Sequence, residues 1–450
     1  MAPRRRGWRG PGAVTTLATA ATAAPPSAKP RGVVSATRAL LSPEAQFLVL
    51  TAGGSGNEAP LRRLLDSPLD WLKLRSLSQQ ERATLIVWQW LQRLGTGRMP
   101  ADVANEWRRL AMVCEFESHR LEQCLHEAVD ALVTRGIEVM LLKGSALAQT
   151  AYASFAERPM GDLDIMVRAE RAHEAWSVLQ TRGWTWPSAR WPAEGYPGHQ
   201  HLPPLLDTRG EGLRLEVHTD LLPAGHPFQL PSEALWRDAQ TVRLHQQTAR
   251  APDPMRQLLH GSIHFAWTHE LRWGGWRAFR DVGILTSGAH FPWEPFVTLA
   301  RDSHATTACY WALRLARSLA GVSVPPGVLR ALRPHRPELL TQRLEYHYAL
   351  QLFPSEGGCP SVRLGRRLWA LGMAPRWSGH GSIRPWQFDP LRTPAAAAGS
   401  HAWPRRLLHR VRKAAATIAY LQRVTARSPN AVERQPRDEE HQCAGEEGSR

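Results

Sequence analysis

The spacing of hydrophobic residues changes twice along this chain of 450 residues. Residues 41–135 have apolar side chains at intervals of three and four, which predicts a helical lead-in. In residues 136–250, short apolar runs next to glycines alternate with helical segments, which predicts a core of strands and helices. Residues 251–355 return to the helical spacing and predict a helical C-terminal domain.

The predicted core contains three strands on which the chemistry depends. Residues 137–142 and 163–167 are short apolar runs, and residues 213–221 begin with alternating apolar and polar positions. Helices are predicted between the first two strands, over 145–153, and after the second strand, over 169–182. This order predicts an α+β fold, in which a small mixed β-sheet is flanked by helices.

Both ends of the chain differ from the middle in composition. Residues 1–40 are rich in Ala, Thr and Pro and predict a disordered extension. Three arginines near the start imitate a secretion signal, but the stretch that follows has too few strongly apolar residues for one. Residues 356–450 are rich in Arg and Pro and predict a largely disordered tail with a basic helix near 405–423, which either contacts RNA or a membrane surface or is simply solvated.

The net charge of +16 lies in these ends. Residues 36–360 hold 34 Lys and Arg against 33 Asp and Glu, whereas residues 1–35 hold six against none and residues 361–450 hold 16 against seven. A nucleic-acid groove built into the fold requires an excess of basic residues in the middle, so nucleic acid is disfavoured as a partner of the folded core.

The hydropathy of the chain and the spacing of its cysteines indicate in which cellular compartment the protein is expected. No uncharged apolar run reaches the roughly 18 residues that cross a bilayer, so no integral membrane segment is expected. The five cysteines include no C-x-x-C pair, which favours a reducing compartment over a disulfide framework. The sequence therefore predicts a cytoplasmic location.

Three short motifs on the predicted strands can support chemistry: Lys143-Gly144-Ser145, Asp162-Leu163-Asp164 and Glu216-Val217-His218. Because side chains alternate along a strand, Asp162 and Asp164 point the same way, and Glu216 can share their face of the sheet. Carboxylates held together need a cation between them, and oxygen ligands suit one or two Mg²⁺ ions, with Mn²⁺ as a second candidate. Such ions assist phosphoryl displacements, and a Gly-Ser turn at a helix start suits phosphate oxygens.

These motifs occur in a wider pattern that matches a known family. The pattern consists of Leu142 to Ser145, Tyr152, the run from Arg158 to Val167, Gly183, Leu215 to His218, and the helical stretch from Leu258 through His260 and His264 to Arg280 and Asp281. On these residues the chain resembles the uncharacterised nucleotidyltransferase family of the polymerase-β-like nucleotidyltransferase superfamily, over residues 136–290.

The resemblance implies an enzyme that moves a nucleoside monophosphate from an NTP, with ATP the first candidate, to an acceptor hydroxyl and releases pyrophosphate. Asp162 and Asp164 would bind the metal ions, and Glu216 would complete the metal site or activate the acceptor hydroxyl. The superfamily more often has Asp at that third position, so the role of Glu216 stays open between these two. His218 would support the metal ligands from behind.

The resemblance also implies a nucleotide site. Gly144 and Ser145 would hold the terminal phosphates, while Lys143 and Arg158 would neutralise the triphosphate. The acceptor is unidentified: the near-neutral middle favours a small molecule, peptide or protein over RNA. An RNA-modifying transferase and a catalytically inactive binding or regulatory protein remain the alternatives, although the latter usually lacks one of the acids that this chain keeps.

Two further groups of residues have a purely structural interpretation as well as a functional one. His260 and His264 have the i, i+4 spacing of a zinc pair, but no third ligand is evident, so packing against the sheet is favoured. The 19 tryptophans are expected mainly in the core, with one or two near the cleft able to stack on a base.

Overall fold

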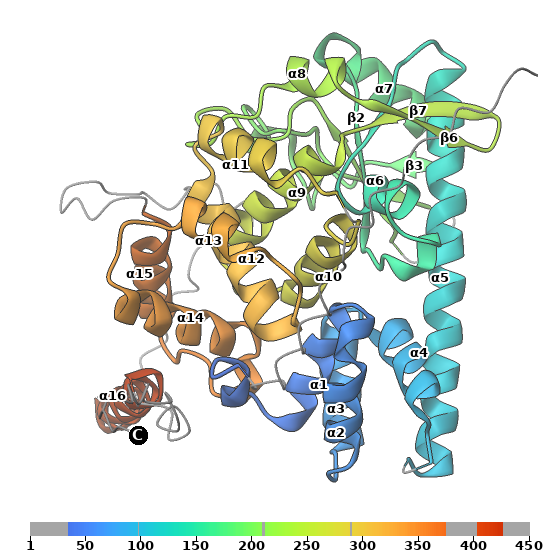
Figure 1. Cartoon of the computed structure of the whole chain (residues 1–450). Coiled ribbons are helices and arrows are strands. Elements are labelled where there is room, and N and C mark those ends of the chain that lie inside the picture. The colour runs from blue at the N-terminus through green and yellow to red at the C-terminus, as the bar shows by residue number, and fades with distance from the viewer. Residues whose placement is uncertain (1–34, 98, 209–211, 289, 375–402, 426–450) are drawn as a thin grey trace, which may run out of the picture. The chain divides into compact units, whose positions relative to one another are not determined.

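The computed structural model describes residues 35–374 and 403–425, except residues 98, 209–211 and 289. Most of the predicted extension over 1–40, and the parts of the predicted tail at 375–402 and 426–450, lie outside the described residues. The architecture is α+β, with a mixed seven-stranded sheet and many flanking helices, which confirms the predicted fold class (Figure 1).

The sheet has the strand order β3-β4-β5-β2-β1-β7-β6. Its strands are β1 (Met140–Leu141), β2 (Asp162–Met166), β3 (Trp184–Thr185), β4 (Leu205–Asp207), β5 (Arg214–His218), β6 (Gln240–Leu244) and β7 (Gln247–Ala251). The pairs β2–β5 and β1–β7 are parallel, and the other neighbours are antiparallel. The three predicted strands thus form the adjacent strands β1, β2 and β5 at the centre.

Helices precede the sheet along the chain. They are η1 (Arg38–Leu40), α1 (Pro43–Ala52), η2 (Ser55–Asn57), α2 (Glu58–Leu65), α3 (Trp71–Gln80), α4 (Thr84–Leu94) and α5 (Ala101–Val133). Local sequence fixes their ends: Ser42 caps α1 by accepting a hydrogen bond from the Ala45 N–H, and Pro43 occupies the first helical position. Gly95, at φ 97°, ends α4.

Shorter helices connect the strands. They are α6 (Lys143–Thr150), η3 (Phe155–Glu157), η4 (Ala169–Arg171), α7 (Ala172–Gln180), η5 (Ala193–Gly195) and α8 (Ser232–Arg237). The predicted helix over 145–153 corresponds to α6, which begins two residues earlier, directly after β1. This early start places Lys143 in the first turn of a helix.

The C-terminal helices begin directly after β7. They are α9 (Pro254–Ile263), a π-helical turn η6 (His264–Thr268), α10 (Gly275–Leu285), α11 (Trp293–Asp302), α12 (Thr306–Ala320), α13 (Pro326–Leu332), α14 (Glu338–Leu352), η7 (Pro354–Glu356), α15 (Val362–Met373) and α16 (Trp403–Thr425). Asp253 caps α9 by accepting hydrogen bonds from two backbone N–H groups, and Pro254 begins it.

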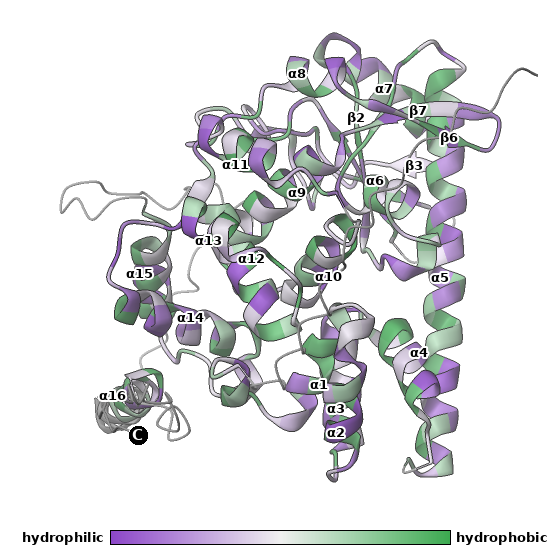
Figure 2. Ribbon diagram, in the orientation of Figure 1, coloured by the Kyte–Doolittle hydropathy of each residue, from purple (hydrophilic) through white to green (hydrophobic). Residues whose placement is uncertain are grey.

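The molecule has two large hydrophobic cores, and their boundaries do not follow the order of the segments along the chain. The first joins buried residues of the lead-in, such as Leu48, to those of the C-terminal helices, such as Leu313. The second lies against the sheet and includes Leu163 and Val217. Helix α5 contributes to both, and its ribbon alternates between hydrophilic and hydrophobic residues (Figure 2). A single helix thus connects the two cores.

The stretch predicted as a tail contains ordered helix. Trp369 of α15 is 3% exposed, and its indole N–H donates to the Ala266 carbonyl of η6 over 2.7 Å. Helix α16 includes the predicted basic helix, and its Tyr420 is buried beside His347 of α14. Apolar side chains therefore attach these segments to the fold. None of the described helices is long and apolar enough to cross a membrane.

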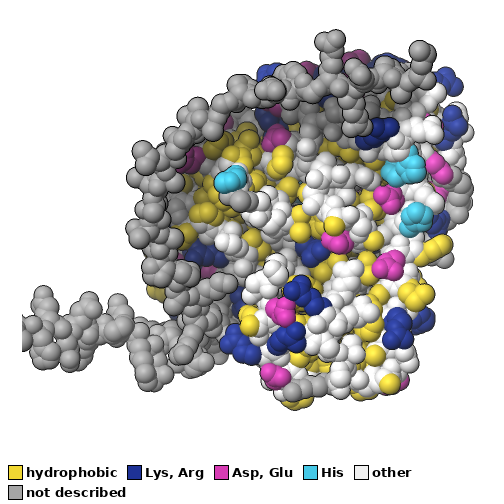
Figure 3. All heavy atoms as spheres, turned by 45° about the vertical axis from the view of Figure 1, so that its right-hand side comes forward, with side chains coloured by type: hydrophobic (Ala, Val, Ile, Leu, Met, Phe, Trp, Pro, Cys, Tyr) yellow, Lys and Arg dark blue, Asp and Glu magenta, His cyan; other side chains and the backbone are white. Residues whose placement is uncertain are grey.

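Acidic and basic side chains are interspersed on the face drawn in Figure 3. The described residues of this face form no broad field of one sign. This distribution agrees with the near balance of charges in the middle of the sequence.

Candidate active site

Strand pairing brings the predicted acidic residues together. Strands β2 and β5 run parallel in a register that sets Asp164 opposite Glu216 and Asp162 opposite Arg214. Along β2 the carboxylates alternate with the fully buried Leu163 and Ile165 in the sheet core. The acids are therefore directed to the side of the strand away from that core.

Asp164, Glu216 and His218 form a tight buried group. Each offers a ligand atom, and these atoms all lie within 4.8 Å of one another. Asp162 stands at the margin, with its side chain 30% exposed and an ion pair to the Arg214 guanidinium. Arg214 also places its Nε 3.4 Å from Glu216 Oε1 and so helps to balance the second carboxylate.

Lys143 supplies the cation that the carboxylates need. It opens α6 with a left-handed backbone, φ 45°, and its Nζ donates to Asp164 Oδ1 over 2.8 Å and lies 3.8 Å from Glu216 Oε2. Burial alone would lower the pKa of Lys143, but Asp164 and Glu216 raise it, so the ammonium stays charged. The backbone conformation is unusual for a residue with a side chain and indicates a position held by its surroundings.

The carboxyl groups differ in their affinity for protons. Burial and the charges of Asp164 and Glu216 raise the pKa of Asp162. For Asp164 burial acts in the same direction, but Lys143 and the hydrogen bond from His218 outweigh it and hold its pKa below the ordinary value. The pKa of Glu216 is held well below its usual range, because His201, His218 and Lys143 outweigh its burial.

His218 lies behind the carboxylates. It is fully buried, and its Nε2 is 2.9 Å from Asp164 Oδ1 and 3.6 Å from Glu216 Oε2. Its Nδ1 has no hydrogen-bond partner among the described residues, which places the ring proton on Nε2, between the two acids. His218 therefore contacts two of the carboxylates that are expected to hold the metal.

A second histidine, not identified from the sequence, reaches the same carboxylate. His201 Nε2 lies 3.4 Å from Glu216 Oε2, and the backbone of His201 bridges to His218. Its ring packs against His199, with centroids 4.1 Å apart. Burial lowers the pKa of His201 to about 3, so the ring is neutral, and its single ring proton lies on Nδ1, which donates to the Leu202 carbonyl over 2.7 Å.

The Gly-Ser turn is joined to strand β2. The Ser145 side chain is fully buried, and its hydroxyl accepts a hydrogen bond from the Asp164 N–H over 3.2 Å. A Cβ on Gly144 would come within 3.2 Å of Met160, so glycine allows a close approach there. No side chain caps the start of α6, so the backbone N–H groups of its first turn have no side-chain acceptor.

Arg158 is fixed by an acid from the C-terminal helices. Its Nε and Nη2 donate to the two oxygens of Asp281 over 2.6 and 2.8 Å, and the Tyr152 hydroxyl donates to the same carboxylate over 2.6 Å. The three residues belong to the pattern that the sequence analysis singled out. The structure joins them into one bridge between the sheet region and α10.

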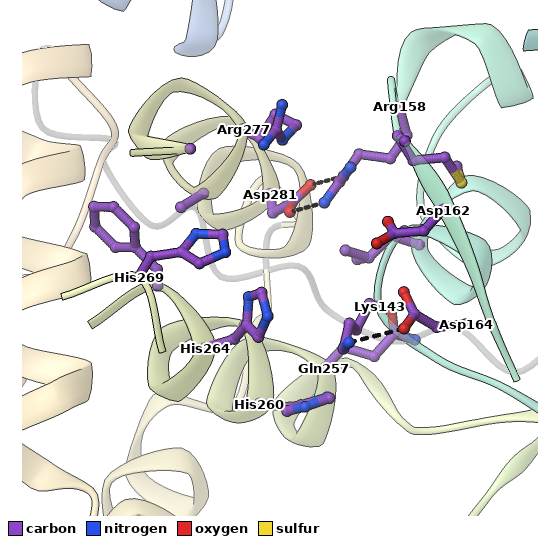
Figure 4. Close-up of a pocket in the computed structure, with 18 of the residues that line it drawn as sticks. Lys143, Arg158, Asp162, Asp164, Gln257, His260, His264, His269, Arg277 and Asp281 are labelled. Atoms are coloured by element: carbon purple, nitrogen blue, oxygen red, sulfur yellow. Dashed lines mark hydrogen bonds and ion pairs between the residues drawn. The ribbon is translucent and has the colours of Figure 1, made fainter. Parts of the chain in front are cut away.

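A cavity of about 530 Å³ separates the acidic strands from the C-terminal helices. Figure 4 shows Lys143, Asp162 and Asp164 on one side and residues of α9, η6 and α10 on the other. His260 and His264 line the second side, with ring centroids 6.4 Å apart. Over the described ranges the one metal-ligand group is Asp164, Glu216 and His218, so the structure gives the His260–His264 pair no third ligand.

The donor set suits a divalent cation. Asp162 and Asp164 line the cavity and supply carboxylate oxygens, the ligands that Mg²⁺ prefers, while the Nε2–H group of His218 holds Asp164 in place. Burial and then the charges of Asp164 and Glu216 raise the pKa of Asp162, and a cation bound beside these carboxylates would lower it. The residues that are present therefore fit a bound metal ion.

Comparison with known proteins gives one match. A family model described as an uncharacterised nucleotidyltransferase matches residues 67–321, which is more than half of the chain. The matched region contains both the strands with the carboxylates and the helices on the opposite side of the cavity. No curated protein and no solved structure matches significantly.

Proposed function

This chain belongs to an uncharacterised nucleotidyltransferase family, and from that membership we propose that it transfers a nucleoside monophosphate from an NTP to a hydroxyl group in the cavity beside Asp162 and Asp164. The observation that supports this most is the pairing of β2 with β5, because two aspartates and a lysine line one cavity and Glu216 is paired with Asp164 next to them. A metal ion, Mg²⁺ in the first place, would be held by Asp162, Asp164 and Glu216 and would neutralise charge on the reacting phosphate.

In the proposed reaction the acceptor oxygen forms a bond to the α-phosphorus, the bond from that phosphorus to the bridging oxygen breaks, and pyrophosphate leaves. Glu216 is surrounded by Lys143, His201 and His218, which favours the ligand role over that of a base. The hydroxyl proton therefore passes to solvent water in the cavity, which leaves Asp162 ionised to hold the metal ion. Backbone N–H groups at the start of α6 bind phosphate oxygens, with Lys143 close by.

The acceptor belongs to a class that needs no basic groove. The interspersed charges of the surface and the near-neutral middle of the chain favour a small molecule, a peptide or a protein over RNA. The alternative of an inactive binding protein is disfavoured because all three acidic residues are present.

The test is incubation of the full chain with Mg²⁺, each α-labelled NTP and pools of candidate acceptors. We expect pyrophosphate release or label transfer that falls at least about 100-fold in the double variant Asp162→Asn/Asp164→Asn. Asp302→Asn, an exposed residue on α11, serves as the matched control and should keep full activity. Equal activity in the double variant and the control would refute the proposed site.

A further inference from the structure

Three arginines that line the cavity form no ion pair with the described residues: Arg190, which packs over the Trp191 ring, Arg82 and Arg277. No carboxylate of the described residues lies within 4.0 Å of the Arg82 or Arg277 guanidinium, whereas Arg158 is paired with Asp281 and Arg214 with Asp162. Neither Arg82 nor Arg277 was singled out by the sequence. Both side chains are instead held by backbone carbonyl groups, which fix a guanidinium without neutralising it.

Arg82 lies beside the first aspartate. Its Nη1 donates to the Met160 carbonyl over 3.4 Å, and a Cβ on Gly161 would lie 2.7 Å from its Nη2. The guanidinium therefore packs on the backbone directly before Asp162. Glycine at 161 is what leaves room for it.

The backbone of Arg82 is also unusual. It has φ 58° at the end of α3, where the Ala83 N–H closes the helix by donating to the Ser78 carbonyl over 2.7 Å. Glycine is favoured at such a position, because a side chain is strained there. An arginine at this position indicates that the side chain has a use other than ending the helix.

Arg277 is held against the same turn. Its Nη1 donates to the Glu81 carbonyl over 3.2 Å, and the Glu81 carboxylate accepts a hydrogen bond from the Trp276 N–H. The start of α10 and the end of α3 are thus bound together, which brings Arg277 near Arg82. Burial, with the charge of Arg158 and a smaller contribution from Arg82, lowers the pKa of Arg277, although the charges of Glu81 and Asp281 act in the opposite direction.

Like charges brought together in a cavity are unfavourable unless an anion joins them. A guanidinium offers a planar pair of N–H donors that matches the oxygens of a phosphate group. We infer that Arg82 and Arg277 form an anion subsite that binds a phosphate group of a substrate. The inference rests on the proposed function only in treating this cavity as the place where substrates bind.

The phosphate has two possible sources, the terminal phosphates of the NTP or a phosphate on the acceptor. Calorimetric titration with Mg²⁺ separates them, using a non-reacting methylene analogue of ATP, AMP and pyrophosphate as ligands. If the source is the NTP, Arg82→Gln and Arg277→Gln each bind the analogue and pyrophosphate about tenfold more weakly and bind AMP unchanged. Arg109→Gln, an exposed arginine on α5, is the matched control and should bind all three as the wild type does.

If the source is the acceptor, the variants bind the ATP analogue unchanged. Inorganic phosphate then binds to wild-type protein saturated with the analogue, and this binding is about tenfold weaker in both glutamine variants. Unchanged affinity for the analogue, pyrophosphate and phosphate in both variants overturns the subsite. Thermal unfolding verifies that the variants are folded, and Arg277→Lys, which keeps the charge but not the planar pair, should show a smaller loss of about threefold.

The two proposals fail separately in this experiment. A wild-type protein that binds the ATP analogue, together with variants that bind it and phosphate equally well, refutes the subsite and leaves the proposed transfer reaction standing. A wild-type protein that binds no nucleotide, but binds phosphate in a way that both variants weaken, refutes the proposed reaction and supports the subsite.

Discussion

The residue with most effect on the site is Lys143. It places one ammonium between Asp164 and Glu216, in the position that a divalent cation would compete for. Buried carboxylates are tolerated only with such compensation, and removal of one partner leaves the others uncompensated. Lys143 therefore has a stabilising role that can be measured apart from any activity.

We expect Lys143→Gln to lower the free energy of unfolding by about 3 kcal/mol in the presence of a chelator, because two buried acids lose their counter-ion. Added Mg²⁺ should recover part of this loss and should stabilise the variant more than the wild type. Urea denaturation with EDTA and with Mg²⁺ measures both effects. Arg171→Gln, whose Nε lies 2.7 Å from the exposed Glu174 carboxylate, should lower the free energy of unfolding only slightly; equal losses in the two variants would contradict the assigned role.

The sequence predicts the acids of the site better than their supports. Because side chains alternate along a strand, the sequence alone sets Asp162 and Asp164 on one face of the sheet. The same alternation on a second strand allows Glu216 to share that face. His201 comes from a segment outside the named strands and reaches Glu216 only through a backbone bridge. Arg82 lies some 80 residues before β2, so only the packing of α3 and α10 brings it to the cavity.

Helix α5 contributes buried residues to both large hydrophobic cores. Its N-terminal half places Trp107 in the helical core, and its C-terminal half places Leu125 in the sheet core. A rigid helix shared by two cores couples their unfolding, since neither core can lose it without exposing apolar surface of the other.

We expect Leu125→Ala to destabilise the protein by about 3 kcal/mol, because a fully buried side chain is replaced by a cavity. The loss should appear in one cooperative transition, seen alike by circular dichroism and by tryptophan fluorescence. Phe116→Ala on the same helix removes a side chain that is 70% exposed and should change the stability by less than about 0.5 kcal/mol. Two separate transitions in the Leu125 variant would show that α5 does not couple the cores.

Periodic elements were predicted well, and elements without a period were not. The helices from α9 to α13 lie within the predicted helical domain over 251–355, whereas the sequence pattern predicts no hairpin at the positions of β6 and β7. Its inward residues include small alanines, and its two-residue turn places His245 at φ 50° without the glycine or asparagine that usually marks such turns. Helix α14 also lies within the predicted helical domain, although it buries Glu345 and His347 along with its apolar residues, which weakens the amphipathic signal.

At the scale of the whole molecule, many histidines are buried and neutral. Burial lowers the pKa of several of them to about 3 or 4, namely His199, His201, His226, His260, His269 and His347. In the unfolded chain these groups titrate near 6.5. Between these values the unfolded chain binds more protons than the folded one, so stability rises with pH through this window and falls on acidification.

His347 isolates one such contribution. Burial lowers its pKa to about 4, so it should cost about 3 kcal/mol of stability as the pH falls from 6.5 to 4. We expect His347→Gln to unfold with a shallower dependence on pH over this range in urea titrations. His335→Gln, at an exposed position, should keep the wild-type slope; identical slopes in both variants would contradict the assignment to His347.

The contact between Trp369 and the Ala266 carbonyl has a practical consequence for the length of any expressed fragment. A fragment that stops at the last residue of the family match, 321, lacks the indole that packs on Trp267 and holds the π-helical turn. That turn begins with His264, on the far wall of the cavity from the carboxylates. A truncated protein could thus retain every predicted catalytic side chain and still have lost the outer support of its substrate chamber.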